Sequence, residues 1–322
     1  MALPLQFISC DWGTSNFRIR LIDSLSLKVL EEFKTEMGVN KLHKKYKSQS
    51  KVSQEQFYKD YLLSQVGLFT QLRENEVLIV ASGMITSAIG MIELPYAKVP
   101  VSFSCEDLLV EFKPLEKNCK ILLISGLKTK NNVMRGEEIQ AIGLIEYLPK
   151  HPEGILILPG THSKHINFKL DKINDFTTFM TGELFDVFSK HTILSNSIKI
   201  VDWDSKFIGS FLEGVKKGVN NNQLSSFFSI RANHLLYDTS MEKNYYYLSG
   251  LLIGSELSYL KNTQEKIYLA TSGILHELYL LALTSFISAD RVFCFEEEVI
   301  DKALIAGHKK MINASVVKNV KV

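Results

Sequence analysis

The chain has 322 residues, which corresponds to roughly two domains of about 150 residues each. Hydrophobic residues make up 46% and charged residues 22% of the sequence, as in ordinary globular proteins, and this excludes disordered and collagen-like classes. Lys and Arg number 37 and Asp and Glu 35, and the resulting formal charge of +2 lacks the basic excess of dedicated nucleic-acid binders.

The cysteines and the apolar segments point to an intracellular protein. Cys10, Cys105, Cys119 and Cys294 form no C-x-x-C pair, so we expect neither a disulfide scaffold nor a zinc site. The first ten residues lack the basic flank of a secretory signal. No stretch reaches the ~18 consecutive apolar residues of a membrane helix. We therefore expect a cytoplasmic location, and neither nucleic acid nor membrane as a partner.

The first half of the chain alternates strand and helix patterns. Residues 1–35 predict an antiparallel strand meander, with strands at 7–10 and 17–22. The lysine-rich residues 41–51 predict a solvated loop. Ser53 begins a capping-box pattern that predicts an amphipathic helix through Phe69. Further patterns predict buried strands at 77–81 and 121–124 and a helix at 137–148.

The second half follows the His-Pro-Glu-Gly sequence at 151–154, where we place the domain boundary. Residues 1–150 are expected to form one domain and residues 151–322 the other. Strands are predicted at 155–158, 166–171 and 173–179, and helices at 183–191, 245–260, 274–286 and 297–311, the last one closing the fold. This alternation predicts a mixed sheet covered by helices in an α/β protein.

A pattern near the start of the chain occurs again 147 residues later. Residues 7–23 and 155–171 both consist of an apolar strand, a Gly-Thr turn with a nearby Ser, an alternating strand and an Asp; the two glycines are Gly13 and Gly160. Such a turn gathers backbone N–H groups and hydroxyls without bulk, as a phosphate chain requires. Gly-Thr-Ser turns are also ordinary hairpin chemistry, and that alternative stays open.

These two turns resemble the phosphate motifs of the actin-like ATPase superfamily, and the chain as a whole resembles the 2-dehydro-3-deoxygalactonokinase family. The segments that match this family are residues 11–18, 81–85, 93–96, 132–140, 158–164, 179–184, 229–232 and 247–257. They occur in order and cover most of the chain.

The resemblance implies a fold, a reaction and a set of ligands. The fold would have two ribonuclease-H-like lobes, each with a five-stranded mixed sheet and flanking helices, and a cleft for MgATP and a sugar acid. The reaction would transfer the γ-phosphoryl group of ATP to the 6-hydroxyl of 2-dehydro-3-deoxy-D-galactonate. The cofactors are then ATP and Mg²⁺. The oligomeric state is left open, with a homodimer as one alternative.

The nucleotide candidates lie in and beside the two turns. Their backbone or side-chain donors would bind phosphates, and a glycine pair on a later helix would allow close approach to the nucleotide. The candidates are Gly13, Thr14, Ser15, Asn16, Arg18, Gly160, Thr161, His162, Ser163, Lys164, Thr181, Gly182, Gly250 and Gly254. For Gly250 and Gly254, close helix packing explains the spacing equally well. An outward position on the hairpin is the alternative for Lys164.

Three carboxylates are the candidates for catalysis. Asp11 ends the first strand, where it is suited to hold Mg²⁺ through water; capping the hairpin is its alternative role. By resemblance to related sugar kinases, Glu137 is the general base, with Glu138 in reserve. Acidic residues in the first turn of a helix are also favoured by the helix dipole alone.

The sugar-acid candidates are residues suited to bind a carboxylate or a hydroxyl. They are Ser82, Gly83, Met84, Tyr96 and Arg135. For Arg135 the alternative is an ion pair with Glu138 or another carboxylate.

The sequence departs from the family near its C-terminal end. Glu277 stands in the approximate place of an Arg in the adenosine region, residues 271–279, and a second Gly-Asp turn is replaced by residues 295–299. Two alternatives follow: a kinase of another sugar acid or hexose, and a non-catalytic nucleotide-binding relative.

Overall fold

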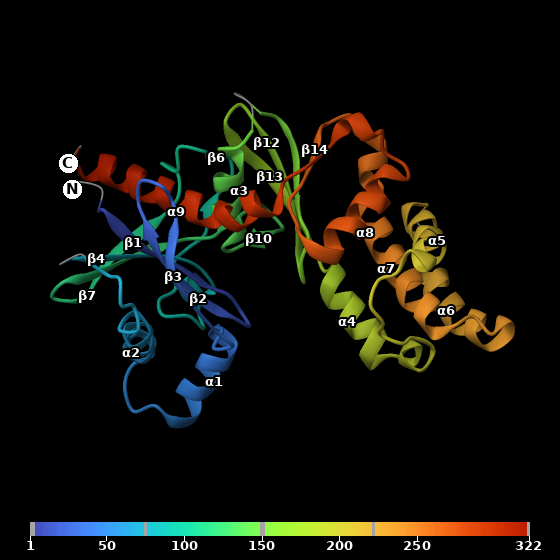
Figure 1. Ribbon diagram of the computed structural model, residues 1–322, viewed down its shortest axis with the longest axis horizontal. Helices are drawn as coiled ribbons and strands as arrows, with labels where there is room; N and C mark the ends of the chain where they lie inside the picture. Colours follow the sequence, from blue (N-terminus) through green and yellow to red (C-terminus); the bar gives the residue numbers. More distant parts are fainter. Residues whose placement is uncertain (1–3, 74–75, 149–151, 221–222, 321–322) are drawn as a thin grey trace. The chain divides into compact units, whose positions relative to one another are not determined.

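The computed structural model describes residues 4–73, 76–148, 152–220 and 223–320 (Figure 1). Its contacts divide the chain into two compact units. Unit 1 consists of Met1–Pro152, Phe168–Phe176 and Glu298–Val322, and unit 2 of Glu153–Asn167 and Thr177–Glu297. The boundary expected at residues 150–151 lies outside the described residues. The division also differs from the expected domain at 151–322, because the closing helix and residues 168–176 belong to unit 1.

The large sheet of unit 1 begins with the predicted meander. Its strands are β1 (Gln6–Trp12), β2 (Phe17–Asp23), β3 (Val29–Thr35), β4 (Val77–Gly83), β7 (Val110–Glu116) and β8 (Cys119–Ile124). They lie in the order β3-β2-β1-β4-β8-β7. The first three are antiparallel, whereas β4 is parallel to β1 and β8 is parallel to β4. The strands predicted in the first half of the chain are confirmed.

The second large sheet repeats this order. Its strands are β6 (Val101–Ser102), β11 (Gly154–Leu158), β12 (Ser163–Lys169), β13 (Lys172–Phe179), β14 (Ile267–Leu269) and β15 (Val292–Cys294). Their order is β15-β14-β11-β12-β13-β6. The strands that precede the two Gly-Thr turns are β1 and β11. When the two sheets are aligned on these strands, the order β13-β12-β11-β14-β15 matches the order β3-β2-β1-β4-β8. The internal repeat seen in the sequence is therefore a repeat of topology.

The fold is mixed α/β as expected, but the expectation of five strands in each sheet is wrong. In the described residues each large sheet has six strands, and a third sheet has the order β10-β9-β5. Its strands are β5 (Ala97–Lys98), β9 (Leu127–Lys128) and β10 (Val133–Met134). The extra strands are β7, which pairs with the outer edge of β8, and β6, which pairs with β13. Each adds to an edge whose N–H and C=O groups would otherwise be unpaired.

The α-helices follow the sequence patterns with three exceptions. They are α1 (Val39–Gln49), α2 (Gln54–Val66), α3 (Glu137–Ile145), α4 (Thr181–His191), α5 (Ile208–Val219), α6 (Gln223–Tyr237), α7 (Met241–Leu257), α8 (Gly273–Thr284) and α9 (Glu297–Val320). Short 3₁₀ helices occupy Met84–Thr86, Ile193–Ser197, Ser205–Phe207, Ser258–Asn262 and Ala289–Arg291. The loop predicted at 41–51 is wrong, and the sequence patterns gave no prediction of α5 or α6.

The helix α1 forms in spite of its lysines because one side of it is buried. Val39 and Leu42 are at most 2% exposed and join the core of unit 1. The predicted cap of α2 is confirmed, since the Ser53 hydroxyl accepts a hydrogen bond from the Gln56 amide at 3.2 Å. The prediction of a loop was wrong because it gave too much weight to the charged residues on the exposed side of α1.

The sheet of unit 1 is covered on both faces. Ile8, Cys10 and Trp12 of β1 face α1 and α2 and form the larger core. The alternate residues of β1 face the other way, where Ser9 meets His308 of α9. Figure 1 shows α9 running beside this sheet. Period-two alternation therefore gives β1 one apolar face and one face that can hold polar groups.

The core of unit 2 consists of α5, α7 and α8 packed against β11 and β14. Buried residues of this core include Ile157, Phe211, Ile253 and Leu278. The helices α5 and α7 approach at glycines: a Cβ added to Gly250 would collide with the Phe211 carbonyl oxygen. The two helices are therefore in backbone contact.

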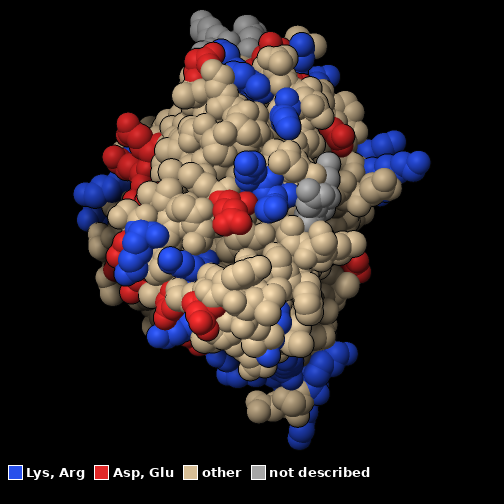
Figure 2. All heavy atoms as spheres, turned by 90° about the vertical axis from the view of Figure 1, so that its right-hand side faces the viewer, with Lys and Arg blue, Asp and Glu red and all other residues tan. Residues whose placement is uncertain are grey.

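The surface carries mixed charge. Figure 2 shows one face on which Lys and Arg side chains are interspersed with Asp and Glu over a largely uncharged area. None of the described helices combines the length and the apolar character needed to cross a membrane.

Candidate active site

The first Gly-Thr turn is bound through its carbonyl groups to the start of α1. The carbonyl oxygens of Gly13, Thr14 and Ser15 accept hydrogen bonds of 3.0 to 3.2 Å from the amides of residues 38–40. Gly38 permits this approach, because a Cβ there would collide with the Thr14 carbonyl. The carbonyls are thus directed inward, whereas the side chains at residues 14–16 are exposed.

The second turn is bound to the start of α4 through one of its carbonyl groups. The Glu183 amide donates to the Thr161 carbonyl at 3.1 Å. A Cβ on Gly182 would lie 2.7 Å from the Gly160 carbonyl oxygen, so Gly182 allows the helix to approach the turn. The His162 ring and the Glu183 carboxylate add a contact of 2.5 Å. Each repeat therefore consists of a turn, a close glycine and a helix N-terminus, a pattern that a longer comparison of the two halves could have revealed.

Asp11 lies among charged side chains on one face of the unit 1 sheet. It is directly opposite Arg18 on β2 and Ser82 on β4. Burial raises the pKa of the Asp11 carboxyl above its usual value, Arg18 and Arg20 oppose this rise, and Glu137 adds to it. The Arg18 Nε atom is buried and has no hydrogen-bond partner among the described residues. The structure thus brings Asp11 near the predicted base, Glu137, and leaves a buried donor beside it.

Two glycines bring the end of β4 and the start of α3 together. Gly83 has φ = 91° and Gly136 has φ = 113°, values that only glycine adopts readily. A Cβ on Gly136 would lie 3.2 Å from the Gly83 Cα atom. The end of β4 is in turn paired with β1 at Trp12, so Gly83 and Gly136 meet beside the first turn.

The two base candidates differ in their surroundings. Glu138 is fully buried, and both of its carboxylate oxygens accept from the Gly136 amide at 2.8 and 2.9 Å. Burial, reinforced by the charge of Glu137, raises the pKa of Glu138 to about 8. Glu137 is only partly buried and accepts from the Arg135 amide at 3.0 Å. Glu137 is therefore the more accessible of the two carboxylates.

The Arg135 side chain is held by the loop of residues 84–96. Its Nη1 atom donates to the carbonyl and hydroxyl oxygens of Thr86 at 2.5 and 2.6 Å, and Nη2 donates to the Leu94 carbonyl at 3.2 Å. The guanidinium lies 4.1 Å from the centre of the Tyr96 ring. Arg135 therefore shapes the loop that contains Met84 and Tyr96, a role that the alternative of an ion pair with Glu138 did not include.

Sequence reasoning missed a buried histidine behind the predicted sugar side. The His308 ring of α9 binds the hydroxyls of Ser9 at 2.8 Å and Ser82 at 3.0 Å. Burial lowers the pKa of His308 to about 3, so the ring is neutral. The Ser82 hydroxyl is thus engaged with α9. No local signal could have found this group, because its members are 226 and 299 residues apart.

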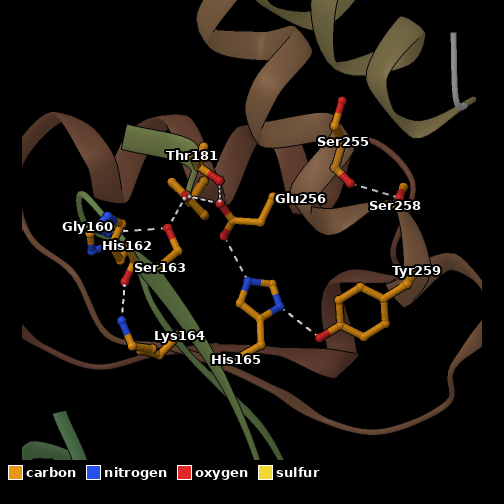
Figure 3. Close-up of polar contacts among 11 residues, drawn as sticks. Gly160, His162, Ser163, Lys164, His165, Thr181, Ser255, Glu256, Ser258 and Tyr259 are labelled. Atoms are coloured by element: carbon orange, nitrogen blue, oxygen red, sulfur yellow. Dashed lines mark hydrogen bonds and ion pairs between the residues drawn. The ribbon is translucent and has the colours of Figure 1, made fainter. Parts of the chain in front are cut away.

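Two polar residues of the second turn, Ser163 and Lys164, are buried in unit 2, whereas Thr161 and His162 are exposed (Figure 3). The Ser163 hydroxyl accepts from the Gly160 amide at 3.4 Å and lies 3.2 Å from the Tyr279 hydroxyl. Lys164 is only 3% exposed, and its Nζ donates to the His162 carbonyl at 2.7 Å. The alternative of an outward Lys164 is therefore wrong.

A pocket of about 340 Å³ opens beside the second turn, within unit 2. This volume lies near the lower end of the range of small-molecule sites. Its lining includes the turn and α4 N-terminus, several aromatic rings and the start of α8: Gly160, Thr181, Gly182, Phe185, Trp203, Tyr245, Tyr246, Ile274, Leu275, Leu278 and Tyr279. The residues from α8 fall in the expected adenosine region, residues 271–279.

Comparison with known proteins identifies the family. The model of the family described as 2-keto-3-deoxy-galactonokinase matches residues 11–306. The chain belongs to this family. It is therefore a phosphotransferase, and a kinase of carbohydrate metabolism.

Individual members of the 2-keto-3-deoxy-galactonokinase family are similar over almost their whole length. The 2-dehydro-3-deoxygalactonokinase of Escherichia coli (strain K12) is 31% identical over 310 residues, covering 95% of this chain and 94% of that protein. A Rhizobium meliloti (strain 1021) protein assigned the same activity is 30% identical, with coverages of 87% and 89%. A crystal structure of a Sinorhizobium meliloti protein, also assigned this activity, has a TM-score of 0.78 at 29% identity and covers 96% of each chain.

In this member of the family, Gly250 and Gly254 pack against α5. Added Cβ atoms at these positions would collide with the carbonyl oxygens of Phe211 and Val215. Neither glycine is among the residues that line the pocket. The structure thus brings the pair to a helix contact, which is the alternative that the spacing left open.

Proposed function

We propose that this kinase transfers the γ-phosphoryl group of ATP to the 6-hydroxyl of 2-dehydro-3-deoxy-D-galactonate, giving the 6-phosphate and ADP. The observation that carries the proposal is the duplicated turn with inward carbonyls, present in both units of a chain from this kinase family. Phosphoryl transfer depends mainly on positioning and on neutralising charge, and two such turns supply backbone donors for that purpose.

We further infer that each large sheet, with the helices that cover it, forms a ribonuclease-H-like lobe. The support is the common strand order β3-β2-β1-β4-β8 and β13-β12-β11-β14-β15.

Each unit contains its own candidate phosphate-binding turn, and unit 2 also contains a pocket that suits a nucleoside. Phosphates would bind at residues 13–16 with Arg18, whose buried Nε lacks a partner in the described chain, and at residues 160–164 with the N-terminus of α4. The pocket adjoins Gly160 and Gly182, and its aromatic and aliphatic lining suits an adenosine moiety. A substitution in either turn should therefore weaken ATP binding.

Mg²⁺ fits the carboxylates of unit 1. The described residues contain no cluster of three or more metal-ligating side chains. Magnesium in kinases needs only one or two carboxylates together with substrate phosphates and water. Asp11 meets this requirement, because it is a partly buried carboxylate near Glu137 and next to the first turn. When bound, the ion would neutralise charge on the phosphates.

Glu137 is assigned as the general base and the loop after β4 as the sugar-acid side. A partly buried carboxylate at the start of α3 can accept the proton of the attacking 6-hydroxyl. The turn at Gly83 and Met84, supported by Arg135 and Tyr96, would hold the sugar acid against it. Arg135 would act mainly by holding that loop.

The test is coupled detection of ADP with Mg²⁺ and two acceptors, 2-dehydro-3-deoxygalactonate and its gluconate epimer. We expect turnover with the galactonate compound and a lower kcat/KM with the epimer. A panel of other sugar acids and hexoses defines the acceptor range. Preference for another acceptor would overturn the substrate assignment, and ATP binding without turnover on any acceptor would indicate a non-catalytic relative.

A further inference from the structure

A buried carboxylate of unit 2 joins the second turn to two helices without belonging to either ligand site described above. Glu256 lies on α7, and its side chain is 1% exposed. It is not among the residues that line the pocket. Figure 3 shows it between His165 and Thr181, directly behind the turn at residues 160–164.

Three different segments donate hydrogen bonds to the Glu256 carboxylate. His165 Nε2, on β12, lies 2.8 Å from Oε1. The Tyr279 hydroxyl, on α8, donates to Oε2 at 2.8 Å. The Thr181 hydroxyl, in the first turn of α4, donates to the same oxygen. One carboxylate thus holds the strand after the turn, the helix that binds the turn and the helix that lines the pocket.

Counting protons gives each of these bonds a direction. A carboxylate only accepts, so the single hydroxyl proton of Tyr279 is used on Glu256, and burial beside Glu256 keeps the pKa of Tyr279 well above its usual value. The Tyr279 oxygen can then accept from the Ser163 hydroxyl, 3.2 Å away. Ser163 in turn accepts from the Gly160 amide at 3.4 Å.

The outer end of the network is defined in the same way. With its Nε2–H given to Glu256, the His165 ring can accept at Nδ1 from the Tyr259 hydroxyl, which lies 2.7 Å away. In the hydrogen-bond network that links Gly160 to Tyr259, each hydroxyl and ring nitrogen can then act as donor or acceptor without conflict. Satisfied buried networks of this kind hold their members rigidly, because leaving one donor unpaired is costly.

We propose that Glu256 is a positioning residue for ATP, which sets nucleotide affinity by holding the second turn, the α4 N-terminus and the start of α8 in one arrangement. The inference rests on the proposed function, in that the turn at residues 160–164 binds ATP phosphates. It also directs the Ser163 hydroxyl inward, because its proton is donated to Tyr279. The phosphates would then be bound by the exposed backbone of the turn.

The test compares two substitutions of Glu256. Glu256→Leu has a similar volume and no acceptor, and should weaken ATP and ADP binding about tenfold or more, the equivalent of one buried hydrogen bond left unmade. Glu256→Gln keeps one acceptor, and His165 can reverse its tautomer to accept from the new amide. Glu256→Gln should therefore restore binding to within about threefold of wild type.

Calorimetric titration with ATP and with ADP provides the readout, and the KM for the sugar acid should stay unchanged. Glu242→Leu is the matched control, since Glu242 lies on the same helix and binds Lys199 at the surface. Normal ATP affinity in a folded Glu256→Leu protein overturns the inference. Should that variant fail to fold, His165→Leu removes one donor and leaves the carboxylate in place; normal ATP affinity there overturns it equally.

A third variant separates this inference from the proposed function. Gly182→Ala places a Cβ 2.7 Å from the Gly160 carbonyl and so displaces the turn itself. Weak binding in Gly182→Ala with normal binding in the Glu256 and His165 variants would refute only the positioning role. Normal ATP binding in Gly182→Ala would refute the assignment of the turn to phosphate.

Discussion

Replacing Glu137 with Gln should lower kcat by about 10²- to 10⁴-fold, the usual contribution of a general base. This corresponds to about 3 to 5.5 kcal/mol of barrier. The loop should stay in place, because the side-chain carbonyl oxygen of the introduced Gln can still accept from the Arg135 amide, which lies 3.0 Å from the wild-type carboxylate. ATP affinity should therefore remain close to that of the wild type.

The same reasoning predicts a much smaller effect at the neighbouring carboxylate. With a pKa of about 8, Glu138 is ionised in only about a tenth of molecules at pH 7. Both of its oxygens are already committed to the Gly136 amide. Glu138→Gln keeps one acceptor for that amide, so we expect kcat within about threefold of wild type.

The assay is coupled ADP release at saturating ATP and sugar acid, with ATP affinity measured separately. Glu146→Gln serves as the matched control, because Glu146 is exposed at the other end of α3 and pairs with Lys310. A loss of less than about threefold in Glu137→Gln would refute the base assignment. A large loss in Glu138→Gln, with wild-type activity that rises about fivefold from pH 7 to pH 8, would transfer the role to Glu138.

Two further predictions concern stability. Gly250→Ala should lower the free energy of unfolding by about 1 to 3 kcal/mol through overpacking against α5, and the folded protein should keep its ATP affinity. The control is Gly209→Ala on α5, which should not destabilise the protein because a Cβ there meets nothing within 4 Å. Weaker ATP binding without loss of stability would favour nucleotide contact at Gly250. The raised pKa of Glu138 predicts that stability is highest below the unfolded-state value near 4.5 and is lost as pH rises toward about 8. Between pH 5 and pH 8, the free energy of unfolding measured in urea should fall by about 3 kcal/mol more in wild type than in Glu138→Gln. Equal pH dependence in the two proteins would contradict this prediction.

Local patterns predicted those elements whose residues follow a simple local rule. The strand β1 contains a mostly apolar run and β2 alternates apolar and charged residues, and Ser53 starts α2 with its own side chain. The helix α1 was missed because two buried residues, Val39 and Leu42, outweigh several lysines that remain in water. Charge density alone is therefore a poor guide to whether a segment is ordered.

The polar groups behind the two turns could not be predicted from the sequence. Glu256 meets His165, Thr181 and Tyr279 across separations of 91, 75 and 23 residues. Such groups are assembled by the packing of α7 between the strands and α8, and no spacing rule relates them. The family motifs identified the turns, whereas the supports of the turns became visible only in three dimensions.

Under the proposed assignment of both turns to phosphates, the inward direction of their carbonyl groups determines how the protein would bind an anion. A loop whose oxygens are tied to helix amides presents the positive ends of peptide dipoles outward, although it carries no net charge. Such a receptor acts at contact distance, so ionic strength screens it far less than it screens a surface lysine cluster. Discrimination among anions would then come from the shape of the loop rather than from long-range attraction.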